Sequence, residues 1–196
     1  MSWGFYGREQ ELQGLRDILS RNRWFFTRIT GRRRIGKTTL VQQALQATPT
    51  RPVFYVQVPD SGPAGVLSAV HDAMDTFGLA AEDFPRPDSL LAFARTVGQL
   101  QSAGHLVALD EFQYFSRKHL SEFTSHLQAT VDDLSGRADS VPGGLIVLGS
   151  LHAELVGRRS VLSKTRQHAR LRRFPRHPEA CLGPPGRAPV PGCWRT

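Results

Sequence analysis

An eight-residue pattern near the start of the chain constrains its fold more than any other feature. Residues 31–38 read GRRRIGKT, which fits the pattern G-x-x-x-x-G-K-[S/T]. The aromatic and β-branched run at residues 24–30 predicts a strand before it, and residues 38–47 predict a helix after it. A turn between a strand and a helix N-terminus can point successive backbone N–H groups at phosphate oxygens. The pattern therefore indicates a phosphate-binding loop, with a chance match in a glycine-rich turn as the alternative.

The residue types inside this loop suggest how a nucleotide would be held. Lys37 is placed to reach the β- and γ-phosphates, and the Thr38 hydroxyl is placed to coordinate Mg²⁺. The expected ligand is ATP with magnesium. The residues predicted to contact it from the loop and the following turn are Gly31, Arg32, Arg33, Arg34, Ile35, Gly36, Lys37, Thr38 and Thr39.

Strand and helix patterns alternate up to about residue 150, which predicts an α/β fold. Further strands are expected at residues 53–58, 105–110 and 144–150. Helices are expected at residues 8–20, as a pair within 62–101 divided by the EDFPRP turn, and at 118–134. Strands separated by helices imply a parallel sheet with right-handed crossovers. The predicted architecture is a P-loop NTPase, a three-layer αβα sandwich.

A second candidate element is the acidic pair that ends an apolar strand in LVALDEFQ. Asp110 is placed to hold Mg²⁺ through water, and Glu111 to polarise the attacking water as general base. The alternative is a pair that caps the following helix. Gln113 and Tyr114 follow directly and either join the catalytic side or simply pack.

Ser150 ends the last predicted strand and is a third catalytic candidate. A small polar side chain there could hydrogen-bond the γ-phosphate or the attacking water, and so distinguish bound ATP from ADP. The alternative is a helix N-cap, because HAEL follows.

Charge and composition divide the chain near Gly157. Residues 1–156 hold 15 Lys+Arg and 16 Asp+Glu, whereas residues 157–196 hold 10 and 1, together with 6 of the 13 prolines. We therefore predict a core at 1–156 and a basic, disordered Pro/Arg/Gly-rich tail at 157–196. Because the basic excess lies in the tail, a nucleic-acid partner is only an alternative, to be tested by removing the tail.

No sequence pattern points to a membrane or to a metal site built from cysteines. The first residues lack a secretory signal, and no apolar run approaches the ~20 residues of a spanning helix. We expect a cytoplasmic protein without membrane association. Cys181 and Cys193 lack the spacing of a zinc site, and the histidines are scattered.

Four segments together resemble the archaeal-type ATPase family, which is related to AAA-type and signal-transducing P-loop ATPases. They are FYGREQELQGL, GRRRIGKTTL, LVALDEFQYF and LIVLGS, spread over residues 3–156. The resemblance implies strand order 5-1-4-3-2, ATP as nucleotide, and metal and base roles for Asp110 and Glu111. It also implies that Phe5, Tyr6, Gly7 and Arg8 lie near the adenine. The alternative for that segment is helix entry with Phe5 and Tyr6 packing.

The chain departs from this family after the fourth strand. We expect the fifth strand to be missing or degraded, with residues 170–174 as the only nearby candidate. No transition-state arginine can be carried over, and Arg158 and Arg159 are unassigned. The abrupt change near residue 157 motivates the hypothesis of a shifted reading frame or truncated gene, which translation of the other two frames would test.

The expected function is a Mg²⁺-dependent ATPase core, hydrolysing ATP to ADP and phosphate, within a molecular switch or regulator whose protein partner is unknown. The first alternative is a nucleotide-binding remnant with little or no hydrolysis, and the second is a nucleic-acid-associated module. A GTPase is disfavoured because no N-K-x-D motif is present. A small-molecule kinase is compatible with the fold, although the Asp-Glu pair moderately favours water over a substrate hydroxyl as acceptor.

Overall fold

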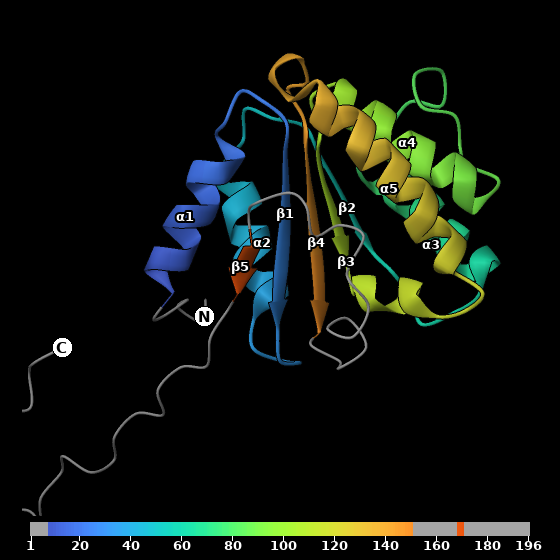
Figure 1. Cartoon of the computed structure of the whole chain (residues 1–196), viewed down its shortest axis with the longest axis horizontal. Coiled ribbons are helices and arrows are strands. Elements are labelled where there is room, and N and C mark those ends of the chain that lie inside the picture. The colour runs from blue at the N-terminus through green and yellow to red at the C-terminus, as the bar shows by residue number, and fades with distance from the viewer. Residues whose placement is uncertain (1–7, 151–167, 171–196) are drawn as a thin grey trace, which may run out of the picture.

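The computed structural model describes residues 8–150 and 168–170, and for the last three only the backbone. Its central feature is a parallel sheet of five strands in the order β2-β3-β4-β1-β5 (Figure 1). The strands are β1 (Phe25–Gly31), β2 (Val53–Gln57), β3 (Leu106–Asp110), β4 (Gly144–Ser150) and β5 (His168–Arg170). Because all the strands run in one direction, their carboxyl ends meet at one edge of the sheet.

Helices cover both faces of the sheet and make a three-layer αβα sandwich (Figure 1). One face packs on α1 (Glu9–Leu19) and α2 (Lys37–Gln46), and the other on α3 (Pro63–Thr76), α4 (Leu90–Ser102) and α5 (Ser121–Gly136). The sequence of β3 is continuously apolar because both faces of the strand are buried. Leu106 and Ala108 enter the core on the first face, and Val107 and Leu109 enter the core on the second. The predicted fold class is confirmed.

A short 3-10 helix, η1 (Phe112–Ser116), follows β3 and was not predicted. It forms because Phe112 and Phe115 turn inward together, with ring centroids 5.4 Å apart. Phe115 is fully buried and stacks on Phe123 of α5 at 4.0 Å. The predicted helix at 118–134 therefore begins only at Ser121, and the residues after Asp110 are held against the core.

The fifth strand is present but reduced to three residues. His168–Arg170 pair in parallel with Arg28, Ile29 and Thr30, whereas β4 pairs with β1 over all seven residues. The order 5-1-4-3-2 is thus found with a degraded last strand. The strand lies at 168–170 and not at the predicted 170–174, so a short stretch of the expected disordered tail is regular. The domain boundary near Gly157, Arg158, Arg159, Cys181 and Cys193 lie outside the described residues.

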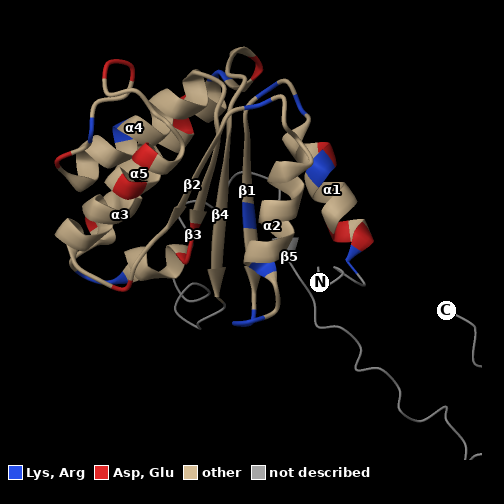
Figure 2. Ribbon diagram, turned by 180° about the vertical axis from the view of Figure 1, so that it is seen from behind, with Lys and Arg blue, Asp and Glu red and all other residues tan. Residues whose placement is uncertain are grey.

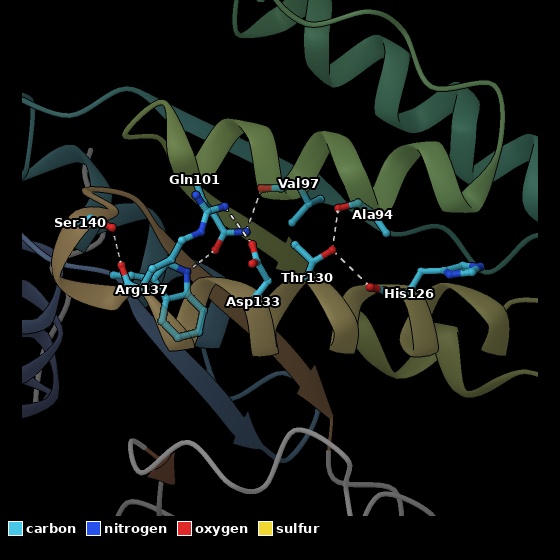
Figure 3. Close-up of polar contacts among 9 residues, drawn as sticks. Ala94, Val97, Gln101, His126, Thr130, Asp133, Arg137 and Ser140 are labelled. Atoms are coloured by element: carbon cyan, nitrogen blue, oxygen red, sulfur yellow. Dashed lines mark hydrogen bonds and ion pairs between the residues drawn. The ribbon is translucent and has the colours of Figure 1, made fainter.

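Hydrogen bonds join β1 to the helical layer at the amino end of the sheet. The Trp24 indole Nε1 donates to Gln101 Oε1 at 2.7 Å, and Gln101 Nε2 donates to the carbonyl of Val97 at 2.8 Å (Figure 3). The backbone N–H of Trp24 donates to Ala138 O at 2.8 Å. In the same view, Thr130 of α5 donates to Ala94 O of α4 at 3.5 Å (Figure 3). These contacts fix the start of β1 relative to α4 and α5.

None of the helices in the described part of the chain is long and apolar enough to cross a bilayer.

Candidate functional site

The turn between β1 and α2 has the backbone of a phosphate-binding loop. Gly36 precedes α2 with φ +79°, and Arg34 has φ +60°, so both adopt the left-handed conformation. Left-handed residues alternating with ordinary ones turn successive N–H groups toward one side of the chain. The N-terminus of α2 follows at once and adds a positive end to this concave turn.

Lys37 reaches back over the loop. Its ammonium Nζ donates to Arg32 O at 2.9 Å and to Gly31 O at 3.3 Å, and the residue is only 8% exposed. Burial lowers the pKa of Lys37, an effect partly offset by the negative charges of Glu111 and Asp110. The ammonium is therefore held at the loop, close enough to Glu111 and Asp110 for their charges to act on it.

Asp110 is the centre of the polar contacts at this edge. Its carboxylate Oδ2 accepts from the Thr38 hydroxyl and from the Tyr55 hydroxyl, both at 2.6 Å. Its Oδ1 accepts from the backbone N–H of Glu111 at 2.7 Å. Asp110 is 2% exposed, so these three bonds stabilise a charge that would otherwise be costly to bury. The structure brings together the two predicted metal-binding residues, Thr38 and Asp110.

Tyr55 is a site residue that sequence reasoning missed. It lies on β2, whose alternate residues Phe54 and Val56 enter the core under α3, so its side chain points to the opposite face. Burial raises the pKa of Tyr55, and the bond to Asp110 raises it further. The hydroxyl therefore stays protonated and donates. The signal that could have identified Tyr55 is the pairing register of β2 with β3. Gln57 pairs with Asp110, and Tyr55 lies two residues before Gln57 on the same strand.

The oxygen ligands present suit magnesium. A hydroxyl and a carboxylate are hard donors, and Mg²⁺ is held in such sites by few protein groups together with water and phosphate oxygens. The Thr38 hydrogen is directed at Asp110, which leaves the lone pairs of Thr38 Oγ1 for a cation. In the described residues, no cluster of three or more His, Cys, Asp or Glu side chains forms another metal site.

Glu111 stands just beyond β3 in a left-handed backbone conformation, with φ +53°. Non-glycine residues rarely adopt it without a functional or packing reason. Its side chain makes no capping bond to η1, which disfavours the alternative of a helix cap. Its carboxylate instead accepts a hydrogen bond from the Gln113 amide.

Ser150 ends β4 beside Gly31 in the register of the sheet and is 5% exposed. Its backbone N–H donates to Gln113 Oε1 at 3.0 Å. The structure thus places Ser150 at the same edge as the loop and the acidic pair (Figure 1). The nucleotide-sensing role stays a prediction, and the helix expected after Ser150 lies outside the described residues.

The remaining predicted contacts differ in exposure. Arg32, Arg33, Arg34 and Thr39 are exposed, whereas Ile35 is half-buried and packs on the core beneath α2. Figure 2 shows the basic turn before α2 at the same end of the sheet as the acidic end of β3. Arg8 is 4% exposed, and its charge lowers the pKa of Lys37, so it lies near the loop. Phe5, Tyr6 and Gly7 lie outside the described residues.

The comparison with protein families gives one match over most of the patterned sequence. The profile described as an AAA domain matches residues 25–154, which is more than half of the chain. This match includes the phosphate-binding loop, the acidic pair and the end of β4. No curated protein sequence matches the chain.

Solved structures share the fold at low sequence identity. A Walker-type ATPase of Pyrococcus abyssi is 20% identical with a TM-score of 0.59, over 85% of this chain and 53% of that one. The ORC2 protein of Aeropyrum pernix, in ADPNP–ADP complexes, is 20% identical with a TM-score of 0.58, over 87% and 49%. Cdc6p of Pyrobaculum aerophilum is 18% identical with a TM-score of 0.54, over 86% and 46%. The chain spans about half the length of these structures.

Proposed function

Because the chain belongs to the AAA-domain family, we propose that it binds ATP with Mg²⁺ at the β1–α2 loop and hydrolyses it to ADP and phosphate. The observation that carries the proposal is the convergence of Lys37, Thr38 and Asp110 at one sheet edge, with Thr38 and Asp110 joined by a 2.6 Å hydrogen bond. These residues come from a loop and a strand far apart in sequence, and a packing role alone does not require them to meet.

Each group has a distinct task in this proposal. The loop N–H groups and the Lys37 ammonium bind the β- and γ-phosphates, and Thr38 and Asp110 hold the metal, Asp110 through water. When bound, Mg²⁺ neutralises phosphate charge and favours attack at the γ-phosphate. Glu111 accepts the proton of the attacking water, and Ser150 contacts the γ-phosphate or that water. Arg8 is buried close enough to Lys37 for its charge to lower the Lys37 pKa, which supports an added phosphate or base contact.

We also propose a switch or regulator role. A strand end that contacts the γ-phosphate has this contact when ATP is bound and loses it when ADP is bound. The cytoplasmic location and an unknown protein partner also stay proposals. The nucleic-acid alternative depends on residues 157–196, most of which lie outside the described residues.

The direct test is equilibrium binding and turnover of ATP, with Mg²⁺ and with EDTA. Lys37→Ala should weaken ATP binding about 10- to 100-fold, since charge-assisted bonds contribute about 1.5–3 kcal/mol. Lys118→Ala is the matched control, because Lys118 is exposed beyond η1. Equal affinities for the two variants would contradict binding at the loop.

Turnover separates the ATPase from the nucleotide-binding remnant. Glu111→Gln should retain ATP binding and lose about 100-fold or more in kcat, as expected for a general base. A wild-type rate no higher than that of Glu111→Gln, together with normal binding, would establish the remnant and reject hydrolysis.

A further inference from the structure

The Gln113 side chain connects the ends of two neighbouring strands. Gln113 lies on η1, just after β3, and its Oε1 accepts the backbone N–H of Ser150 at the end of β4 at 3.0 Å. Its Nε2 donates to Glu111 Oε2 at the end of β3. One side chain thus contacts both Glu111 and the strand end proposed to contact the γ-phosphate.

The orientation of this amide follows from its partners. A backbone N–H can only donate, so the amide oxygen must face Ser150, and the NH₂ group must then face Glu111. A carboxylate at position 113 could accept from Ser150 but could not donate to Glu111. An apolar side chain could do neither. Of the common side chains of this length, glutamine satisfies both contacts at once.

The surroundings hold Gln113 in place. A Cβ added at Gly149 would lie 3.2 Å from Gln113 Oε1 and 3.7 Å from Gln113 N, so the end of β4 packs directly on this residue. On the other side, η1 is anchored by Phe112 and by the fully buried Phe115. The Gln113 amide is therefore the group of η1 that lies against the end of β4 at Gly149.

We propose that Gln113 is a positioning residue that holds the Glu111 carboxylate in place and couples it to the end of β4 at Gly149 and Ser150. This inference rests on the proposed function for its effect on turnover. When the β4 end moves relative to η1, the Ser150 bond to Oε1 lengthens or turns, and the bond from Nε2 to Glu111 changes with it. The orientation of the proposed general base then depends on the strand beside it.

Turnover gives the first test. Gln113→Leu keeps the size of the side chain and removes both bonds, and Gln113→Glu keeps only the acceptor. Both should lower kcat by about tenfold or more through misplacement of Glu111, with KM changed less than about twofold. In the Glu111→Gln background, Gln113→Leu should add no further loss. Gln99→Leu, on the exposed face of α4, is the matched control and should leave kcat unchanged.

A second readout does not depend on hydrolysis. In ¹⁵N-labelled full-length protein, Glu111→Ala should shift the Ser150 amide resonance, and the same substitution in a Gln113→Leu background should not. If wild type binds ATP but does not turn it over, hydrolysis fails and this measurement alone decides the coupling. An equal Ser150 shift in both backgrounds overturns the proposal. So does a Gln113→Leu variant with unchanged kcat, or one whose turnover loss is the same with and without Glu111.

Discussion

The Thr38 hydroxyl on the first turn of α2 donates to Asp110 Oδ2 at the end of β3 at 2.6 Å, across 72 residues of sequence. This bond joins the phosphate-binding loop to the acidic pair without a ligand. It also directs the oxygen lone pairs of Thr38 away from Asp110, where a cation can use them.

Thr38→Val should remove the magnesium dependence of ATP binding. Valine keeps the branched shape but has no oxygen ligand, so affinity measured with Mg²⁺ should fall to nearly the value measured with EDTA. Thr76→Val is the control, because Thr76 is exposed at the end of α3 and donates only to Asp72 O. A variant that retains the full Mg²⁺ enhancement would show that Thr38 does not ligate the metal.

Tyr55→Phe should destabilise the protein by about 1–2 kcal/mol, since Asp110 loses one of its charge-assisted bonds. Burial and Asp110 raise the pKa of Tyr55 above its ordinary 10.0, so wild type should keep this advantage below pH 10 and lose it progressively above. Urea unfolding across pH measures both effects. Tyr114→Phe, in η1, should change stability by less than about 0.5 kcal/mol, and an equal loss in both variants would contradict a specific role for Tyr55.

Much of this site could be predicted because the residues that end parallel strands lie close together at one edge of the sheet. The apolar runs ending at Gly31, Asp110 and Ser150 were recognisable as strands, and the alternation with helices made them parallel. Parallel strands place their carboxyl ends at one edge, so the meeting of Thr38 and Asp110 followed. The match to an AAA domain confirms the resemblance that these segments suggested.

What could not be predicted depends on side-chain contacts between distant segments. Tyr55 looked like an ordinary strand aromatic, and its hydroxyl matters only because β3 lies beside β2 in a particular register. Gln113 had no assigned role because η1 forms through the burial of Phe112 and Phe115 and not through a helical repeat. The three-residue β5 has too little sequence to show a period, and it is defined by its pairing with β1.

Lys37→Met should stabilise the nucleotide-free protein at pH 7 while weakening ATP binding, as expected for Lys37→Ala. Burial is the main cause of the lowered pKa of Lys37, so its charged form is disfavoured by folding. The unfolded chain holds that proton up to its ordinary pKa of 10.5, so wild-type stability should rise with pH as it approaches that value. Lys118→Met is the control in urea unfolding. A Lys37→Met variant less stable than the control would mean that the bonds to Gly31 O and Arg32 O outweigh burial.

Gly143→Ala should destabilise the protein by about 1–3 kcal/mol or more through overpacking. A Cβ there would lie 2.0 Å from Gln101 O and 2.5 Å from Gln101 Cα, and backbone atoms of α4 cannot move aside cheaply. Gly14→Ala on the exposed face of α1 meets nothing within 4 Å and should stabilise by about 0.5–1 kcal/mol. Thermal or urea unfolding of Gly143→Ala and Gly14→Ala measures both changes in stability. A Gly143→Ala variant as stable as wild type would refute the close approach of α4 to Gly143, just before β4.

Gln101→Leu should cost about 1–3 kcal/mol, because it leaves the buried Trp24 indole N–H without its acceptor. Trp24→Phe removes the donor and should leave the buried Gln101 Oε1 without this hydrogen bond. If the two groups act as a pair, the double variant should lose less stability than the two single losses added together. A double-mutant cycle in urea measures this coupling, and strict additivity would mean that the bond does not stabilise the start of β1. Nucleotide affinity should stay unchanged in all three variants, because Trp24 precedes β1 at the amino end of the sheet, whereas Lys37 follows β1 and Asp110 ends β3 at the carboxyl end.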